Sequence, residues 1–362
     1  MNERETLLTG FPSNELARRL LPRLLETNRT GRVIVLVPER FVDHANEWLS
    51  ALPNGQRDRT RVIVGDVAWM DLGLSGREYL ELAERVDTIH HCAAVTYSGA
   101  PLEMAERVNV GGTFEMLEFA RQAKGLKQLV HWSTLMATGE EAGVVREDAL
   151  IAPRSNPLAL TRFRAERMIG KARTELPITV LRPAMLVGDS RTGRLARIEG
   201  AHLLISALLN APRDLPILRP ANGDAPLQVV PIDYAVDAGL SIAQDPSSIN
   251  RTYHIIDREA LTLDAAMAAI AELLGKPPPR GALPPLFTNA VLRLPGIDRL
   301  AHAQRSLLDE LGRDVDYDDR NARQLLGSEV CPPLLSYLSK LVAHVERERK
   351  TDRPAPSYSL LR

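Results

Sequence analysis

A single glycine separates a short apolar run from an amphipathic stretch near the start of the chain. Gly10 closes the run at residues 6–10, and Ser13, Asn14 and Glu15 open the helical pattern that follows. A glycine turn between a strand and a helix suits phosphate binding, because backbone N–H groups at a helix N-terminus attract anions. Glycine-rich phosphate-binding turns of this kind usually carry three glycines, and two of the three are absent here. Glu15 would repel a phosphate unless its side chain points away. The alternative is a helix capped by Ser13 or Asn14 with no phosphate nearby.

Leu158 and Arg162 lie four residues apart, so they share one face of the helix predicted for this segment. Arg162 keeps its charge at physiological pH and can donate hydrogen bonds to ligand hydroxyls. Leu158 has no proton to give to a reacting group. The alternative for Arg162 is an ion pair with Glu166, one helical turn further along.

The composition is that of an ordinary globular chain. Its 362 residues, 44% of them hydrophobic, suffice for one large α/β domain with an appended lobe or for two domains. A net charge of -1 without a basic face argues against a nucleic-acid partner. Cys92 and Cys331 lack the spacing of a metal site or a disulfide framework, so no metal is predicted. Without a signal peptide or membrane span, the sequence predicts a cytoplasmic protein.

Apolar runs of strand length alternate with amphipathic stretches of helical length through the first half. This alternation predicts an α/β fold, a Rossmann-like doubly wound parallel sheet with helices on both faces. Ligands of such sheets bind at the carboxyl ends of the strands. The predicted strands cover residues 6–10, 32–37, 61–65, 86–91, 126–133 and 178–182.

The second half predicts a smaller, interleaved substrate lobe and C-terminal helices. A segment at residues 286–311 is apolar on one face and basic on the other, which indicates a helix packed on the main domain or, alternatively, a lipid-contacting lid. We predict a Rossmann-like domain at residues 1–190, the lobe and helices at 191–346, and a disordered tail at 347–362. Within the second part, the predicted helices cover residues 203–209 and 262–274, and the predicted strands cover 227–231 and 252–256.

Seven short motifs resemble those of extended short-chain dehydrogenases/reductases in order and spacing. The chain is similar to the branch related to fatty acyl-CoA reductases and thioester reductases from about Leu7 to about Leu326. The resemblance implies that residues 1–190 bind a nicotinamide cofactor. The motifs are Thr9-Gly10-Phe11-Pro12, Gly65-Asp66, Cys92-Ala93-Ala94, Asn109-Val110-Gly111-Gly112-Thr113, His131-Trp132-Ser133-Thr134, Leu181-Arg182-Pro183 and Val187-Gly188-Asp189-Ser190-Arg191-Thr192-Gly193.

The resemblance implies that the cofactor lies across the sheet with its pyrophosphate at the loop after Gly10. Arg40 would pair with the 2′-phosphate of NADP(H), whereas Glu39 would favour the ribose hydroxyls of NAD(H). We prefer NADP(H). Asp66 would face the adenine ring. The implied cofactor-binding residues are Gly10, Phe11, Pro12, Ser13, Asn14, Arg40, Asp66, Ala93, Ala94, Arg162 and Pro183.

The resemblance also implies that the reaction centre is incomplete. Leu158 occupies the position of the family's catalytic tyrosine, and Arg162 that of its lysine. Ser133 matches the serine that would hold the substrate carbonyl, and Tyr97 is a candidate substitute proton donor. Loss of a general acid lowers a rate by about 10² to 10⁴.

Three functions follow as hypotheses. The first is an NAD(P)-binding protein with impaired or absent reductase activity, which binds NADP(H) or an acyl-type ligand as a sensor, scaffold or partner subunit. The second is an active reductase of an acyl thioester, aldehyde or ketone with a non-standard proton donor. The third is assembly as a homo-oligomer or as a heteromer with an active relative.

Overall fold

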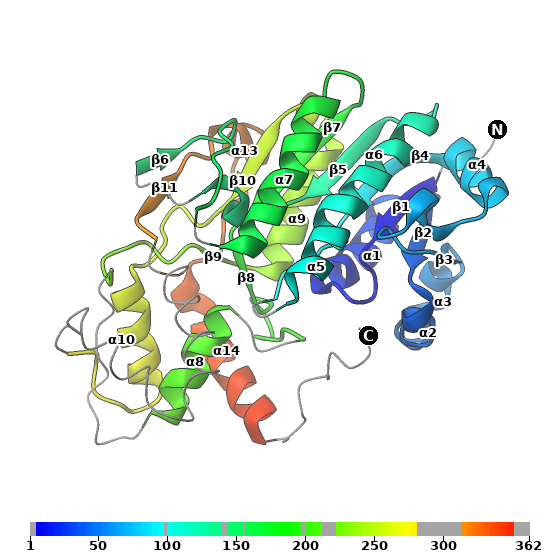
Figure 1. The fold of residues 1–362 in the computed structure, drawn as a ribbon. Helices are drawn as coiled ribbons and strands as arrows, with labels where there is room; N and C mark the ends of the chain where they lie inside the picture. Colours follow the sequence, from blue (N-terminus) through cyan, green and yellow to red (C-terminus); the bar gives the residue numbers. More distant parts are fainter. Residues whose placement is uncertain are drawn as a thin grey trace.

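A parallel sheet of seven strands forms the centre of the computed structural model, which describes residues 5–97, 100–139, 143–154, 156–196, 200–211, 222–280, 311 and 313–350. The strand order is β10-β7-β5-β4-β1-β2-β3, and Figure 1 shows the strands side by side. The chain winds outward in both directions from β1 and β4, so the predicted doubly wound fold class is confirmed. The strands are β1 (Glu5–Thr9), β2 (Arg32–Val37), β3 (Thr60–Val64), β4 (Val86–His91), β5 (Gln128–Trp132), β7 (Ile178–Pro183) and β10 (Thr252–Ile255).

The central strands are buried on both faces because their alternate side chains enter two different cores. Leu8, Val33 and Val35 pack on one side of the sheet, and Leu7 and Ile34 pack on the other. Successive side chains of a strand point to opposite faces. Continuous apolar runs such as residues 32–37 are therefore what a sheet covered on both sides requires.

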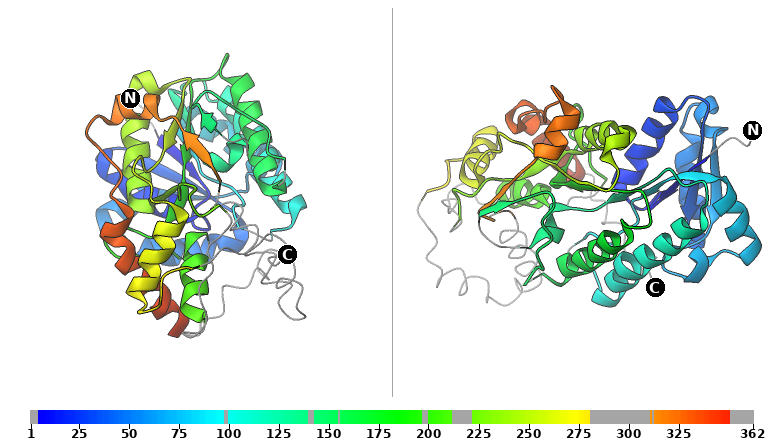
Figure 2. Two further views of the ribbon diagram at one scale, coloured as in Figure 1. Left: turned by 90° about the vertical axis from the view of Figure 1, so that its left-hand side faces the viewer. Right: turned by 90° about the horizontal axis from the view of Figure 1, so that it is seen from above.

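Helices cover both faces of this sheet, as the view from above in Figure 2 shows. One face carries α1 (Glu15–Thr27) and α9 (Ile232–Gln244), and the other carries α4 (Gly76–Arg85), α6 (Gly112–Gln122) and α7 (Pro157–Ala172). Shorter elements lie at the strand ends and edges. They are η1 (Glu39–Phe41), α2 (Val42–Ser50), α3 (Asn54–Arg57), η2 (Met70–Gly73), α5 (Leu102–Ala105), the short π-helix η3 (Glu106–Gly111), η4 (Leu135–Thr138) and η5 (Pro246–Ser248).

A lobe with its own core lies beside the sheet (Figure 1). Leu204 and Leu208 pack into this core, so they are ordinary core residues. The strand predicted at residues 252–256 is not part of the lobe, because β10 pairs with β7 at the edge of the main sheet. The lobe and its surroundings comprise β8 (Met185–Val187) paired with β9 (Val229–Pro231), β6 (Gly143–Val145) paired with β11 (Val315–Tyr317), and the helices α8 (Ala201–Asn210), α10 (Leu263–Leu273), α13 (Arg320–Leu326) and α14 (Leu334–Lys350).

The predicted disordered tail begins too early. Residues 347–350 continue α14, whose preceding turns are anchored in the lobe core by Val342 and Val345. The rest of that tail lies outside the described residues, and so does the predicted segment at 286–311 except for Leu311. Within the described part of the chain, no helix combines the length and the apolar character that a membrane span needs.

Glu147 joins the C-terminal region to the sheet. Its carboxylate is 2% exposed and accepts hydrogen bonds from the backbone N–H groups of His254 (3.0 Å), Asn321 (2.6 Å) and Ala322 (3.1 Å). Burial raises the pKa of Glu147 to about 7, although these three hydrogen bonds act in the opposite direction. The carboxyl group of Glu147 therefore holds the start of α13 against β10, and burial disfavours its ionised form.

Glu147→Gln should lower the free energy of unfolding by about 1–3 kcal/mol, because an amide NH₂ would face a backbone donor. A carboxyl whose pKa is raised in the folded state stabilises the fold most below its ordinary pKa of 4.5, and this contribution is lost as pH rises through about 7. The gap in Tm between the wild type and Glu147→Gln should thus narrow from pH 4.5 to 7.5, as measured by thermal denaturation. The exposed Glu84, changed to Gln, is the control, and a gap independent of pH would contradict this prediction.

Candidate functional site

The loop after β1 requires a glycine and ends in a capped helix. Gly10 has φ +88°, and a Cβ there would lie 2.9 Å from backbone atoms of Cys92 and Ala93. Asn14 caps α1, because its Oδ1 accepts hydrogen bonds from the N–H groups of Leu16 (2.9 Å) and Ala17 (3.4 Å). Its Nδ2 donates to the carbonyl oxygen of Cys92 at 2.8 Å. Of the two predicted capping residues, Asn14 forms the cap, and it occupies two N–H groups that could otherwise bind a phosphate.

Three other residues predicted for this loop take different positions. Phe11 is fully buried and packs edge-on against Trp48, with ring centroids 5.2 Å apart. Pro12 is also buried, whereas Ser13 is exposed and its hydroxyl donates to the carbonyl oxygen of Gly10 at 3.1 Å. Phe11 therefore supports the loop from the core.

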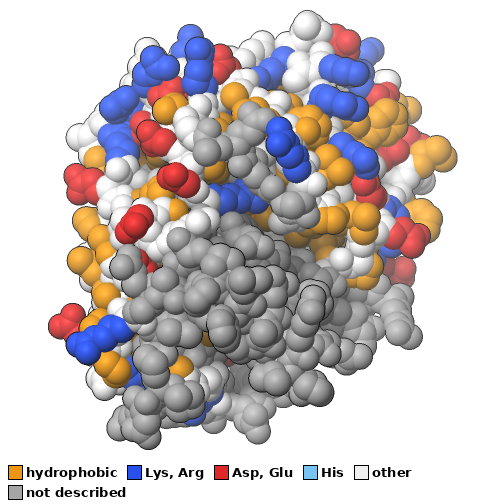
Figure 3. Space-filling view, turned by 60° about the vertical axis from the view of Figure 1, so that its left-hand side comes forward, with side chains coloured by type: hydrophobic (Ala, Val, Ile, Leu, Met, Phe, Trp, Pro, Cys, Tyr) orange, Lys and Arg blue, Asp and Glu red, His pale blue; other side chains and the backbone are white. Residues whose placement is uncertain are grey.

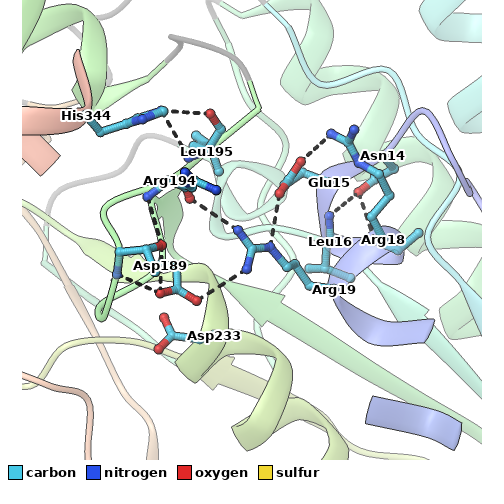
Figure 4. Close-up of polar contacts among 12 residues, drawn as sticks. Asn14, Glu15, Leu16, Arg18, Arg19, Asp189, Arg194, Leu195, Asp233 and His344 are labelled. Carbon is cyan, nitrogen blue, oxygen red and sulfur yellow. Dashed lines mark hydrogen bonds and ion pairs between the residues drawn. The ribbon is translucent and has the colours of Figure 1, made fainter. Parts of the chain in front are cut away.

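Glu15 is neutralised by two arginines of its own helix (Figure 4). Its carboxylate binds Arg18, and it binds Arg19 Nε at 3.1 Å. Arg19 also reaches Asp189 Oδ2 (3.3 Å) and the carbonyl oxygen of Arg194 (3.4 Å). The spacings of three and four residues are favourable on a helix and were the available sequence signal. Glu15 thus leaves no uncompensated negative charge at the start of α1.

Arg40 and Asp66 come together at the ends of β2 and β3. Arg40 Nη1 lies 3.2 Å from Asp66 Oδ2, and the guanidinium carbon lies 5.0 Å from the centroid of the Phe41 ring. The Arg40 side chain is 44% exposed, so its guanidinium remains accessible to a ligand. Glu39 beside it is exposed too. These two predicted cofactor residues, Arg40 and Asp66, therefore lie side by side.

The segment after β4 is held by buried polar side chains. Thr9 Oγ1 accepts hydrogen bonds from the N–H groups of Cys92 and Ala93, each at 3.2 Å. Asn109 is fully buried, and its amide exchanges hydrogen bonds with the backbone of Val95 at 2.8 and 3.1 Å. Asn109 therefore fixes the backbone of the segment after β4. The predicted residues Ala94 and Tyr97, in the same segment, are half-buried.

Arg162 is buried and does not pair with Glu166. The helix that carries it, α7, begins at the cap Asn156, which accepts hydrogen bonds from the N–H groups of Leu158 and Ala159. Arg162 is 5% exposed, and its Nη2 donates to the carbonyl oxygen of Trp132 at 2.7 Å. The predicted ion pair with Glu166 is therefore wrong for the described residues, because another arginine occupies that carboxylate.

Glu166 binds Arg182 and Ser133 in a buried cluster. Arg182 Nη2 and Nε lie 2.6 and 2.9 Å from Glu166 Oε2, and Arg182 Nη1 donates to the carbonyl oxygen of Ala149 at 2.9 Å. The Ser133 hydroxyl donates to Glu166 Oε1. Ser133, expected to hold a substrate carbonyl, is thus engaged by a carboxylate. Sequence reasoning overlooked Glu166 and Arg182 as partners, since they lie 16 residues apart on different elements.

Charged side chains of both signs are mixed on the surface. On the face in Figure 3, lysines and arginines lie among aspartates and glutamates.

Two buried histidines, His91 and His131, stack on each other with ring centroids 5.5 Å apart. Burial and, second, Arg162 lower the pKa of His91 to about 3. The pKa of His131 is also lowered, mainly by burial. Pro183 lies at the carboxyl end of β7. The described residues contain no group of three or more His, Cys, Asp or Glu side chains suited to a metal ion.

The fold and these strand-end residues define an extended short-chain dehydrogenase/reductase of the thioester-reductase type. Residues 8–239 match the model of a NAD-binding family described as Male sterility protein, and the chain belongs to this family.

The chain is similar to only part of each of two relatives with curated names. The chain is 28% identical over 225 residues to a linear gramicidin synthase of Brevibacillus parabrevis, covering 59% of this chain and 4% of that protein. It is 25% identical over 281 residues to the fatty acyl-CoA reductase wat of Drosophila melanogaster, covering 66% of this chain and 53% of that protein. The chain therefore spans about half, or much less, of the length of these relatives.

A solved structure shares the whole fold. The terminal R domain from the myxalamid PKS-NRPS biosynthetic pathway superposes with a TM-score of 0.79 at 23% identity, covering 98% of this chain and 93% of that one. At this identity the likeness concerns the fold alone. The lobe and the C-terminal helices are thus part of a known arrangement.

Proposed function

We propose that this protein binds NADP(H) in preference to NAD(H) and has impaired or absent reductase activity. The observation that carries the proposal is the state of three side chains at the carboxyl end of β5 and on the first turns of α7. Leu158 has no acidic proton to donate. The Arg162 guanidinium donates to the carbonyl oxygen of Trp132, and the Ser133 hydroxyl donates to the carboxylate of Glu166. A carbonyl reduction needs a proton donor at the carbonyl oxygen, and none of these three side chains is free to supply it.

Cofactor binding is supported at the positions that the resemblance implies for the pyrophosphate and the 2′-phosphate. Gly10 lets the loop after β1 pass close to the backbone of Cys92 and Ala93, where a Cβ would lie only 2.9 Å away, and the exposed guanidinium of Arg40 suits the 2′-phosphate of NADP(H). A bound nicotinamide cofactor would supply hydride chemistry. The Asn14 cap reduces the number of free N–H groups for the pyrophosphate, so we expect the affinity to be modest. Binding without turnover is the behaviour of a sensor, a scaffold or a partner subunit.

The second candidate is an active reductase of an acyl thioester, aldehyde or ketone, and one observation favours it. Thr134 is half-buried next to Ser133, and its Oγ1 accepts a hydrogen bond from the N–H of Met136 at 3.3 Å. Among the described residues its own proton has no acceptor, so this hydroxyl is a better substitute donor than Ser133. Thr134→Val would abolish such an activity, whereas Thr134→Ser would keep it.

A titration followed by an assay separates the two candidates. We expect NADPH to bind more tightly than NADH by calorimetry, and Arg40→Ala to remove the difference while Glu39→Ala keeps it. With saturating NADPH, turnover of octanoyl-CoA, octanal and 2-octanone should stay below about 0.1 s⁻¹, a hundredfold under a typical enzyme. Turnover near 10 s⁻¹ would favour the second candidate, and binding of neither cofactor would refute both.

An acyl-type ligand, a cytoplasmic location and assembly as a homo-oligomer or with an active relative stay predictions of the sequence. Size-exclusion chromatography with and without such a relative would test the assembly.

A further inference from the structure

Arg162 is a buried cation with hardly any hydrogen-bond partners. Its side chain reaches from α7 to the carboxyl end of β5, where Nη2 donates to the carbonyl oxygen of Trp132. That is its one hydrogen bond among the described residues, although a guanidinium carries five N–H donors. Nε is sealed from solvent and has no partner among those residues. Buried donors are nearly always satisfied, so this arginine is prepared for an acceptor that the described residues do not provide.

The groups around Arg162 compensate its charge only in part, because the nearby carboxylate of Glu166 is shared with other donors. Glu166, the carboxylate one turn further along α7, is bound by Arg182 through three contacts of 2.6 to 3.1 Å and by Ser133. Burial raises the pKa of the Cys92 thiol well above its ordinary value, so that group stays neutral. His91 is neutral as well, since its pKa is lowered to about 3 by burial first and by Arg162 second. The described carboxylates leave an excess of positive charge at this strand end.

An uncharged ligand would not remove this excess. Burial lowers the pKa of Arg162 to about 10, which reports how unfavourable its charge is in this position. Ribose or carbonyl oxygens could accept its hydrogen bonds but would leave the charge uncompensated. An anion would supply both the acceptors and the opposite charge.

We infer that Arg162 binds the carboxylate of a small organic acid with an apolar chain at the carboxyl end of β5. A carboxylate matches the planar fork of a guanidinium through two parallel hydrogen bonds. The apolar chain follows from Leu158, which lies half-buried one turn before Arg162 on the same face of α7. This inference rests on the acyl-ligand part of the proposed function and deepens it. The ligand would bind at the same strand end, but its head group is a free carboxylic acid in place of a thioester.

Calorimetric titration with octanoate tests the inference on the full chain in the absence of NADPH. We expect octanoate to bind the wild type, and octanamide, which has the same shape without the charge, to bind at least tenfold more weakly. Arg162→Met, which keeps an unbranched, flexible stem but removes the guanidinium, should weaken octanoate binding about thirtyfold or more, the effect expected when one partner of a buried charge pair is removed. Arg167→Met is the matched control, because Arg167 is an exposed arginine of the same helix.

Arg162→Lys keeps the charge without the fork and should give an intermediate affinity, which guards against a folding defect in Arg162→Met. Equal binding of octanoate and octanamide, unchanged binding to Arg162→Met, or tighter binding of inorganic phosphate than of octanoate would overturn the inference. Failure here with NADPH binding retained would refute the carboxylate site alone, whereas octanoate binding without any NADPH binding would refute the proposed function alone.

Discussion

Leu158→Tyr combined with Arg162→Lys is expected to raise the turnover of octanal with NADPH by at least about a hundredfold over the wild type. The tyrosine would stand half-buried on the first turn of α7, where Asn156 fixes the start of the helix through hydrogen bonds of 3.0 and 3.2 Å. A lysine one turn later would place an ammonium beside the phenol and make it more acidic. Initial rates of NADPH oxidation, followed by its absorbance and with the product confirmed by chromatography, measure the gain.

The matched control is Leu158→Phe with Arg162→Lys, which adds the same ring without the hydroxyl. If this control gains as much as the tyrosine variant, proton donation is not what the wild type lacks. No gain in the tyrosine variant, with NADPH binding intact, would show that the reaction centre differs in more than these two residues. Thr134 and the engaged hydroxyl of Ser133 would then be the next positions to change.

Glu166→Gln is expected to lower the free energy of unfolding by about 3–5 kcal/mol, because it leaves Arg182 buried without its counter-charge. Both side chains of this pair are nearly inaccessible, at 2% and 3% exposure. The carboxylate also holds Ser133, so the loop after β5 should loosen too. Urea denaturation followed by circular dichroism measures the loss.

Glu175→Gln is the comparison, since Glu175 is 59% exposed and its pair with Arg121 should contribute less than about 1 kcal/mol. The double variant Glu166→Leu with Arg182→Met should recover most of the lost stability, because replacing both charges removes the uncompensated one. A loss below about 1 kcal/mol for Glu166→Gln would mean that Arg182 is satisfied by its backbone acceptors Ala149 and Glu147.

Much of the fold could be predicted because its signals are local. Runs such as residues 32–37 are apolar at nearly every position, which is what a strand between two helix layers requires. The cap Asn14 was predicted together with Ser13, since both side chains can accept from a helix N-terminus. Only the loop geometry selects Asn14, which also reaches Cys92 on a neighbouring strand end. The end of α14 was placed too early because charged residues in a helical last turn resemble a disordered tail in composition alone.

The sequence by itself determined that position 158 carries no proton donor and that position 162 carries a permanent charge, because these are properties of leucine and arginine in any environment. Only the tertiary structure decided what that charge faces. Helical spacing favoured an ion pair between Arg162 and Glu166, yet Arg182 from β7 donates to both oxygens of the same carboxylate, through Nε to Oε1 and through Nη2 to Oε2. Such a buried, bidentate contact is stronger than a pair along one helix. Arg162 therefore donates to the carbonyl oxygen of Trp132 at the end of β5 and has no carboxylate in direct contact among the described residues.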